Sequence, residues 1–411
     1  MIPENIRDEF PGLKDRIFLD AACVSVPPRP AMEAVRRVTE MLEGTGCASA
    51  TQSHIDLDNL RNTARVEAAR LIQARPDEIA LVESTTHGLN LAAEAIPLQR
   101  GDHVVLCDLE FLEVAIPWVQ KRQALGIEID VVKNRSGAVL VEDIERILAP
   151  RTRVVTISSV QWASGFRCDL AALSDLCRSR GIFLVVDAIQ QLGAVPIDVS
   201  QTPIDYLACG GHKWLNSPFG AGFLYVRRET MPHVRLPLAG YLNVQVEGWD
   251  TYFQNPTIVP VRDYSFADEA RRWEIGGTSN YIGAAALAAS LHMINDLGSS
   301  NISAHVHALA DHLVESLPGL GTSLVTDFPR AQRAGIVSFS IGSADDNLDL
   351  MRHLEQNNVM VSVRYTAGVG GVRVSCHLYN SRADLDRLLS LVGDFMRKRV
   401  AVQVPGDQAK R

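Results

Sequence analysis

Two residues that could do chemistry together each follow an apolar run of the sequence. Asp187 ends the run IFLVVD and opens the motif DAIQ, and Lys213 lies 26 residues later in the motif GGHK. A carboxylate at the end of a buried strand costs free energy unless a cation meets it, and a protonated pyridine nitrogen would serve. A lysine in a glycine-rich turn with an aromatic neighbour would be partly desolvated, which lowers its pKa and favours the neutral amine that forms imines.

Each of these two residues also has an ordinary interpretation. Asp187 alone could be the N-cap of a helix, and Lys213 alone could be a surface lysine. Both motifs nevertheless end predicted strands, which is where open α/β sheets place their ligands. Their convergence therefore favours a binding site with an imine-forming lysine.

A third motif could hold a phosphate group. The run EIALVES leads directly into the polar segment STTHG at residues 84 to 88 and then into LNLAAEAI, which is typical of a helix. Hydroxyls and free backbone amides at the start of a helix attract a dianion. His212, next to the lysine, could add a further donor. The alternative interpretation is a simple Ser/Thr helix cap, which is common.

Seven short apolar runs must position these residues. Val and Ile are prominent in them and polar residues rarely alternate, which indicates strands buried on both faces of a mostly parallel sheet covered by helices. The segment DLAALSDLCRSRG predicts one such helix, with Asp169 as its N-cap and Gly181 as its end. The runs are EIALVES, HVVLCDLE, IEIDVVK, RVVTISSVQ, IFLVVDA, DYLACGG and GAGFLYV.

The pattern changes after Tyr225. Residues 236 to 270 form a long irregular stretch rich in Gly, Pro and aromatic residues, which we expect to be functional or disordered. A helical region follows Asn280, and then GIVSFSI, a helix near 346 to 357, VMVSVRY, GGVRVSCHL and a last helix from Ser381 to about Arg399. That order indicates a smaller α+β unit.

The length of 411 residues exceeds what one hydrophobic core usually fills. We therefore expect an α/β protein with a large domain at residues 16 to 270, which carries the mostly parallel seven-stranded sheet. A smaller α+β domain would comprise residues 1 to 15 and 271 to 400, and residues 401 to 411 would be a disordered tail.

Composition excludes several classes of partner. The net charge of −8 comes from acids and bases mixed along the whole chain, which argues against a nucleic-acid or anionic-membrane surface and favours a small-molecule ligand.

The seven cysteines are scattered and show no CxxC spacing, so we expect neither a disulfide framework nor a metal site. The start of the chain has no signal-like apolar region, and no apolar run is long enough for a membrane span. We expect a cytoplasmic protein.

The motifs together resemble a known family. The chain is similar to fold-type I enzymes dependent on pyridoxal 5'-phosphate (PLP), in the class V aminotransferase family. The closest branch holds cysteine desulfurases, carbon-sulfur lyases, kynureninase-like enzymes and isopenicillin N epimerase. The most specific pieces are DAIQ at 187 to 190 and GGHK at 210 to 213, and the resemblance runs from FLDAACVSVPP to the closing helix.

The resemblance implies a role for each matching residue at the cofactor. Lys213 would form a Schiff base with PLP, Asp187 would keep the pyridine nitrogen protonated, and Gln190 would bind the ring hydroxyl. The residues implied to meet the phosphate are Thr85, Thr86 and His212.

Three further positions carry implied roles. Phe111 matches the position whose ring stacks on the cofactor, although it could be ordinary core. Thr278 in GGTSN matches the threonine that reaches the neighbouring subunit's phosphate, which implies a homodimer with shared active sites. Arg373 in GGVRVSCHLYN matches the arginine that takes the α-carboxylate of an amino-acid substrate, and its planar fork suits that group. The alternative is one more solvated arginine among 34.

Departures from the family pattern narrow the choice of reaction. Desulfurases carry a nucleophilic cysteine shortly before that arginine, whereas this chain has RYTAGVGGVR there. Cys376 lies within a predicted strand and is expected to be a buried core thiol. Gly210 stands where many relatives have serine, and Trp162 where desulfurases tend to have asparagine. The glycines of GVGG precede a strand and not a helix, which argues against a dinucleotide site.

These observations favour β-elimination from cysteine or an S-conjugated cysteine, that is, a carbon-sulfur lyase. The irregular stretch at 241 to 270 could wall a roomy site for a bulky conjugate. Transamination, epimerisation and decarboxylation remain as alternatives within PLP chemistry, because small changes of placement decide which bond breaks. A PLP-binding scaffold without catalysis is an alternative of a different class.

Overall fold

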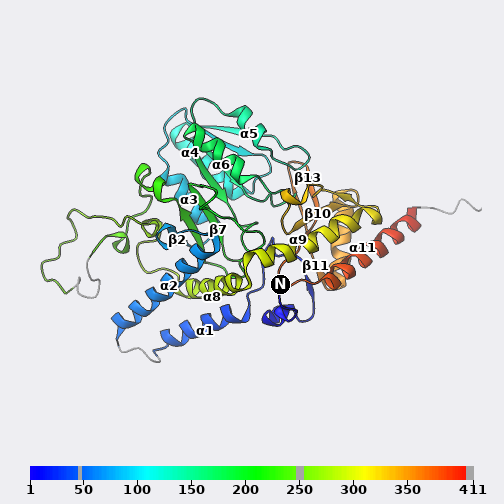
Figure 1. Ribbon diagram of the computed structural model, residues 1–411, viewed down its shortest axis with the longest axis horizontal. Coiled ribbons are helices and arrows are strands. Elements are labelled where there is room, and N and C mark those ends of the chain that lie inside the picture. Colours follow the sequence, from blue (N-terminus) through cyan, green and yellow to red (C-terminus); the bar gives the residue numbers. More distant parts are fainter. Residues whose placement is uncertain (45–48, 247–253, 404–411) are drawn as a thin grey trace, which may run out of the picture.

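The structure is a computed structural model that describes residues 1–44, 49–246 and 254–403. A seven-stranded sheet forms its centre (Figure 1). In spatial order the strands are β2 (Ile79–Val82), β8 (Gly222–Val226), β7 (Tyr206–Gly210), β6 (Phe183–Asp187), β5 (Thr152–Ser158), β3 (His103–Cys107) and β4 (Glu128–Val132). Only β8 runs antiparallel to its neighbours, β2 and β7. The predicted mostly parallel sheet is confirmed, and all seven predicted runs contribute a strand to it.

Alternate residues of each strand face two different cores. Val186 and Leu207 lie in one core, whereas Val185 and Tyr206 lie in the other. Such strands are apolar throughout because successive side chains point to opposite faces and both faces are covered. One face packs against α3 (Thr85–Ala95) and α4 (Leu112–Leu125). The other packs against α2 (Ala50–Ile72), α5 (Val141–Ile147), α6 (Leu170–Arg180) and α8 (Tyr281–Leu297).

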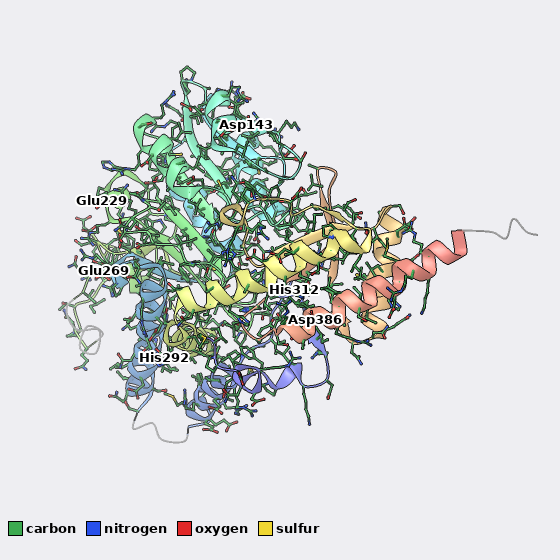
Figure 2. All side chains as sticks on the ribbon, turned by 45° about the vertical axis from the view of Figure 1, so that its right-hand side comes forward. Asp143, Glu229, Glu269, His292, His312 and Asp386 are labelled. Carbon is green, nitrogen blue, oxygen red and sulfur yellow. The ribbon has the colours of Figure 1, made fainter. Side chains whose placement is uncertain are left out.

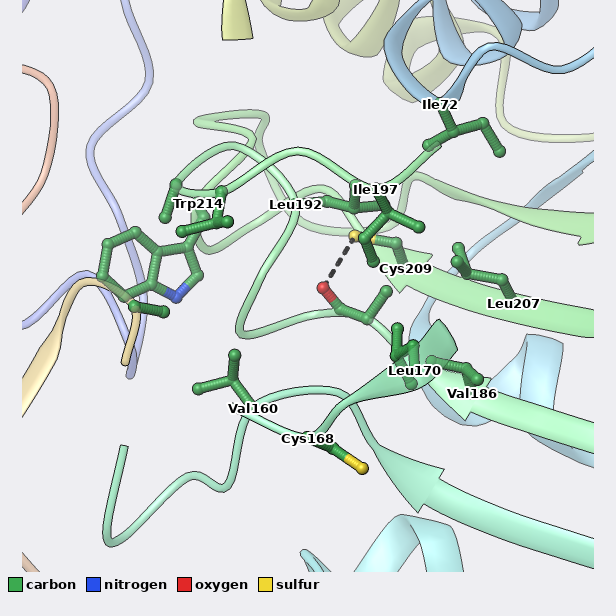
Figure 3. Packing of buried hydrophobic residues seen from close by; sticks show 14 of the residues in the cluster. Ile72, Val160, Cys168, Leu170, Val186, Leu192, Ile197, Leu207, Cys209 and Trp214 are labelled. Atoms are coloured by element: carbon green, nitrogen blue, oxygen red, sulfur yellow. Dashed lines mark hydrogen bonds between the residues drawn. The ribbon is translucent and has the colours of Figure 1, made fainter. Parts of the chain in front are cut away.

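Figure 3 shows part of this second core, where Val186, Leu207 and Cys209 meet Ile72 of α2 and Leu170 of α6. Helix α6 begins and ends as its sequence predicts. The Asp169 side chain accepts a hydrogen bond from the Ala172 N–H, and Gly181 takes the left-handed conformation at the other end with φ of 64°. The long helix α1 (Arg29–Leu42) packs on α8 at the outside of the sheet domain (Figure 1).

A second sheet lies beside the first and has its own core. Its strand order is β12 (Ser362–Thr366), β13 (Val369–Ser375), β10 (Ile336–Ser340) and β9 (Ser323–Leu324). Helices α9 (Ser299–Ser316), α10 (Ala344–Gln356) and α11 (Arg382–Gln403) cover it, and His312 of α9 pairs with Asp386 of α11 at 2.7 Å (Figure 2). Of the GVGG segment, Gly368 lies in the connection of the β12–β13 hairpin and the other three residues begin β13, so the segment leads into a strand as expected.

The N-terminal segment joins the two sheets. Strand β1 (Ile17–Phe18) pairs with β11 (Val359–Met360), and Asp20 bridges to Ser375 at the end of β13. Residues 20 to 23 therefore run along the junction where the large sheet meets the small one. The proposed domain boundaries stay a prediction, and residues 404 to 411 of the expected tail lie outside the described residues.

Candidate active site

One cavity of about 390 Å³ gathers most of the residues that the sequence singled out. It lies at the carboxyl ends of β2, β6 and β7, because these strands run in the same direction and the chain leaves each of them toward the same edge. The residues that line it are Ala22, Cys23, Ser84, Thr85, Thr86, Phe111, Glu113, Trp162, Ile189, Gln190, His212, Lys213, Arg364 and Arg373.

Asp187 is a buried acid at the end of β6. Its Oδ1 accepts a hydrogen bond from the Ile189 N–H at 2.9 Å, and within the described part of the chain no cation pairs with the carboxylate. Burial, reinforced by the negative charge of Glu113, raises the pKa of Asp187 to about 8. Such a group is stable as an anion only beside a buried cation, which is the environment that a pyridinium nitrogen would supply.

Lys213 lines the cavity from the turn after β7, whereas Asp187 is not one of the residues that line it. Burial lowers the pKa of its ammonium group, and the negative charge of Asp187 opposes that shift. Its Nζ lies 5.6 Å from the centre of the Phe111 ring, and Phe111 meets Trp162 edge to face at 5.3 Å. An amine that is partly desolvated next to an aromatic ring is suited to attack a carbonyl carbon.

The first turn of α3 supplies hydroxyls at another side of the cavity. Ser84 caps the helix by accepting from the His87 N–H at 3.1 Å. Thr85 Oγ1 accepts from the Gly210 N–H at 2.9 Å, so its own O–H remains to be donated. Thr86 instead donates to Glu113 Oε2 at 2.6 Å. The helix begins at Thr85, earlier than the LNLAAEAI segment suggested; the cap interpretation of STTHG is confirmed, and anion binding by this segment stays a prediction.

His212 stands beside these hydroxyls as a neutral ring. Burial, with a smaller contribution from the charge of Lys213, lowers the pKa of His212 to about 4. The ring stacks on Phe219 with centroids 5.3 Å apart, and the His212 carbonyl accepts a hydrogen bond from the Ser25 N–H. A neutral imidazole can donate one N–H to an oxyanion without itself being a cation.

Two arginines reach the cavity from the small sheet. Arg373 of β13 is 2% exposed, donates to the Trp162 carbonyl at 3.0 Å and pairs with Asp20 at 3.2 Å. Arg364 of β12 lies with its Nη2 3.6 Å from the sulfur of Cys23. A buried guanidinium whose position is fixed by a carbonyl and a carboxylate is prepared to bind a second carboxylate.

These groups fit a pyridine ring with an aldehyde and a phosphate, because an amine and a hydroxyl-lined helix start surround one space and the charge of a buried acid acts on that amine. The Aminotransferase class-V family model matches residues 17–388. The chain belongs to this family. The predicted resemblance is therefore confirmed over most of the chain.

Three relatives illustrate the range of the class V aminotransferase family. The uncharacterized aminotransferase YcbU of Bacillus subtilis is 28% identical, over 93% of this chain and 95% of its own. The apo cysteine desulfurase of Thermococcus onnurineus is 25% identical with a TM-score of 0.84, covering 97% of this chain and 99% of that one. The cystine C-S lyase C-DES, with glycine covalently linked to its PLP cofactor, is 22% identical with a TM-score of 0.85, covering 95% and 99%.

Membership of this family establishes the general chemistry. The protein is a PLP-dependent enzyme of the α/β, fold type I architecture that acts on an amino acid. In the described ranges, no helix is both long and apolar enough to cross a membrane.

The sequence did not identify three residues that line the cavity, nor Asp20, which pairs with Arg373 of the cavity. Asp20, Cys23, Glu113 and Arg364 stand far along the chain from DAIQ and GGHK, and only the folded junction brings them near. For Asp20 and Cys23 a signal existed, since they belong to FLDAACVSVPP, where the resemblance begins.

Thr278 does not join the cavity of its own chain. Its side chain is exposed, and the described residues of the stretch 241 to 270 do not line the cavity either. Trp249, Tyr252 and Phe253 of that stretch lie outside the described residues. Cys376 is fully buried and burial raises the pKa of its thiol, as expected for a core residue.

Proposed function

We propose that the enzyme is a carbon-sulfur lyase that acts by β-elimination on cysteine or on an S-conjugated cysteine. The observation that carries the proposal is that Lys213 and Arg373 line one cavity and that the buried charge of Asp187 acts on Lys213, while the β12–β13 hairpin beside the cavity contains no cysteine. PLP, when bound, withdraws electrons from the substrate α-carbon. The reaction converts the substrate and water into pyruvate, ammonia and a thiol.

Each residue has a part in this proposal. Arg373 binds the substrate α-carboxylate in a bidentate manner, because Asp20 and the Trp162 carbonyl hold its guanidinium in place. Lys213 attaches the cofactor in the resting enzyme and, once released by the substrate amine, takes the α-proton on Nζ. Asp187 keeps the pyridine nitrogen protonated, and that cation in turn keeps the Asp187 carboxylate ionised.

Other residues hold the cofactor. Phe111 stacks on the ring, which is supported by its position next to Lys213 Nζ. Gln190 donates to the ring hydroxyl, and Thr85, Thr86 and His212 bind the phosphate. For Thr86 to do so, its hydroxyl must leave Glu113.

We also propose that the protein is a cytoplasmic homodimer in which Thr278 of one subunit contributes to the phosphate site of the other. The exposure of Thr278 outside its own cavity supports this arrangement.

The lyase proposal is tested by product analysis. Purified enzyme is incubated with cysteine, cystine and a bulky S-conjugate, and pyruvate, thiol and alanine are measured, with Lys213→Ala as the control. Equal amounts of pyruvate and thiol, absent with Lys213→Ala, support β-elimination. A different amino acid that turns over without releasing a thiol would instead indicate transamination, epimerisation or decarboxylation. Turnover that survives in Lys213→Ala would contradict the assignment of the lysine.

A second candidate function is sulfur transfer to the enzyme, which the position of Cys23 favours. This thiol lines the cavity, and Arg364 donates a hydrogen bond to its sulfur at 3.6 Å. Attack of the Cys23 thiolate on the substrate sulfur would break the Cβ–S bond and form an S–S bond. The products would be alanine and a persulfide on Cys23, with no external oxidant. Alanine formed by the wild type but not by Cys23→Ala would support this reaction over elimination.

A further inference from the structure

The side-chain amide of Gln190 lies between one group that can only donate a hydrogen bond and one that can only accept. The Trp214 indole N–H donates to Gln190 Oε1 at 2.8 Å. On the other side, Gln190 Nε2 donates to the Ala22 carbonyl at 3.0 Å. An indole N–H cannot accept and a carbonyl cannot donate, so the two neighbours together decide which way the amide faces.

In this orientation, the hydrogen bond to Ala22 uses only one of the two hydrogens of the Gln190 amide. The Nε2 group of Gln190 has two N–H bonds, and Ala22 uses one of them. Gln190 lines the cavity next to Lys213 and His212, and it is 4% exposed. The second N–H is therefore available to an acceptor in the cavity. A reversed amide would place its oxygen against the Ala22 carbonyl and its N–H bonds against the indole N–H, which are two repulsive contacts.

Trp214 is itself held by residues that come from distant parts of the chain. Its side chain is completely buried, and the His377 ring lies against it with centroids 5.1 Å apart. A Cβ atom at Gly335 would lie 2.5 Å from Cη2 of the indole, so only glycine leaves room for the ring there. In Figure 3 the indole lies at one side of the packed cluster, away from Cys209 and Leu207. Residues next to the ends of β10 and β13 thus hold the indole in place.

We propose that Trp214 is a positioning residue that holds the Gln190 amide with an N–H toward the ring oxygen of the cofactor. This inference rests on the proposed role of Lys213 and Gln190 and adds a residue that does not itself line the cavity. Through Trp214, the packing of Gly335, which precedes β10, and of His377, which follows β13, determines which atom of Gln190 the cofactor meets.

The proposal predicts a change in the protonation of the bound cofactor. A donor N–H stabilises the ring oxygen as an anion, so the loaded cofactor gives up its proton at a lower pH. The readout is the midpoint pH of the visible absorbance of PLP-loaded protein. Gln190→Ala is expected to raise this midpoint by roughly 0.5 to 1 pH unit. Trp214→Phe, which removes the indole N–H, should raise it by a smaller amount, because Ala22 still favours the native orientation.

The decisive comparison is a double-mutant cycle. Trp214→Phe should have no further effect on the midpoint in the Gln190→Ala background, because no amide remains to be oriented. Gly335→Ala, which pushes on the indole and keeps its N–H, is the second perturbation if Trp214→Phe folds poorly in thermal melts. It too should act only when Gln190 is present.

Two results would overturn the inference. One is an unchanged midpoint in folded Trp214→Phe or Gly335→Ala protein. The other is a shift of equal size with and without Gln190, which would show that Trp214 acts only through packing. A wild-type protein whose visible band is absent, or does not depend on Lys213, would instead refute the proposed cofactor attachment and this inference with it. The product assays above test the type of reaction separately.

Discussion

At the scale of single residues, the site contains a buried acid, Asp187, that forms no ion pair among the described residues. Asp187 has a raised pKa because it is buried and faces Glu113, and Lys213 has a lowered pKa because it is buried. Both groups therefore shift toward their neutral forms in the protein alone. The pyridinium of bound PLP would instead stabilise the charged form of Asp187, so cofactor binding and the ionisation of Asp187 should be linked.

The linkage predicts a pH-dependent stability of the cofactor-free protein. The pKa of Asp187 rises from 3.8 in the unfolded chain to about 8 in the fold. Between these values the folded state binds more protons than the unfolded state, so stability falls as pH rises, by at most about 1.4 kcal/mol per pH unit. In urea unfolding from about pH 5 to pH 8, wild type should lose stability relative to Asp187→Asn. Lys213 is present in both proteins.

Saturating PLP should remove most of the difference in pH-dependent stability between wild type and Asp187→Asn, because the bound pyridinium pairs with the Asp187 carboxylate in its ionised form. Parallel stability curves for wild type and Asp187→Asn without cofactor would show that Asp187 does not carry the predicted shift. A difference that persists with PLP would show that the ring nitrogen does not meet Asp187.

A second prediction at this scale concerns thiol reactivity. Burial raises the pKa of Cys177 to about 12, and the thiols of Cys107, Cys168, Cys209 and Cys376 are also buried with raised pKa values. Cys23 is only partly buried and lines the cavity. In a Cys47→Ser background, iodoacetamide should therefore modify Cys23 first, as measured by peptide mass spectrometry. Loading with PLP should slow the modification, and labelling of Cys177 before Cys23 would contradict the structure.

At the scale of elements, the sequence predicted the individual strands and the residues at their ends. It did not predict the contacts between side chains across the junction of the two sheets. Uninterrupted apolar runs identified all seven strands, since both faces of each strand are buried. Asp187 and Lys213 follow strand ends and so could be placed at one edge. The ion pair of Asp20 with Arg373 joins residues 353 positions apart, and no local pattern encodes that contact. The position of Glu113 against Thr86 likewise depends on how α4 packs on α3.

The start of α3 allows a prediction that separates helix capping from ligand binding. Ser84 caps α3 at the cavity, and Ser343 caps α10 far from it in the same way, by accepting from the backbone N–H three residues on. Ser84→Ala and Ser343→Ala should each lower the free energy of unfolding by about 1 kcal/mol. Only Ser84→Ala should also weaken PLP binding, by roughly fivefold for one lost or loosened hydrogen bond.

Calorimetry of the cofactor-free variants and PLP titration monitored by absorbance provide the two measurements. Equal losses of PLP affinity in both variants would mean that general stability, and not the first turn of α3, controls cofactor binding. Unchanged affinity in Ser84→Ala would remove this helix start from the proposed phosphate site.

At the scale of the whole molecule, one predicted site residue does not line the cavity of its own chain. Thr278 is exposed, although the GGTSN segment is firmly attached through Glu274, which pairs with Arg61 and Arg65 of α2 and accepts from the Leu81 N–H. A segment anchored by a buried ion-pair cluster but presenting an exposed threonine is suited to reach a second copy of the chain. The dimer proposal thus makes a claim about which subunit supplies which residue.

Subunit mixing tests that claim directly. Lys213→Ala should be inactive, and Thr278→Asp should be nearly so, because a carboxylate would repel the partner's phosphate. Neither change should alter thermal stability much, since Thr278 is exposed and Lys213 makes no ion pair among the described residues. If the two variants are unfolded together and refolded, each mixed dimer contains one site with both lesions and one site with neither. Activity should therefore reappear on mixing. Inactive mixed dimers, isolated with two different affinity tags, would place Lys213 and Thr278 in the same subunit's site, and a monomer in sedimentation would exclude sharing altogether.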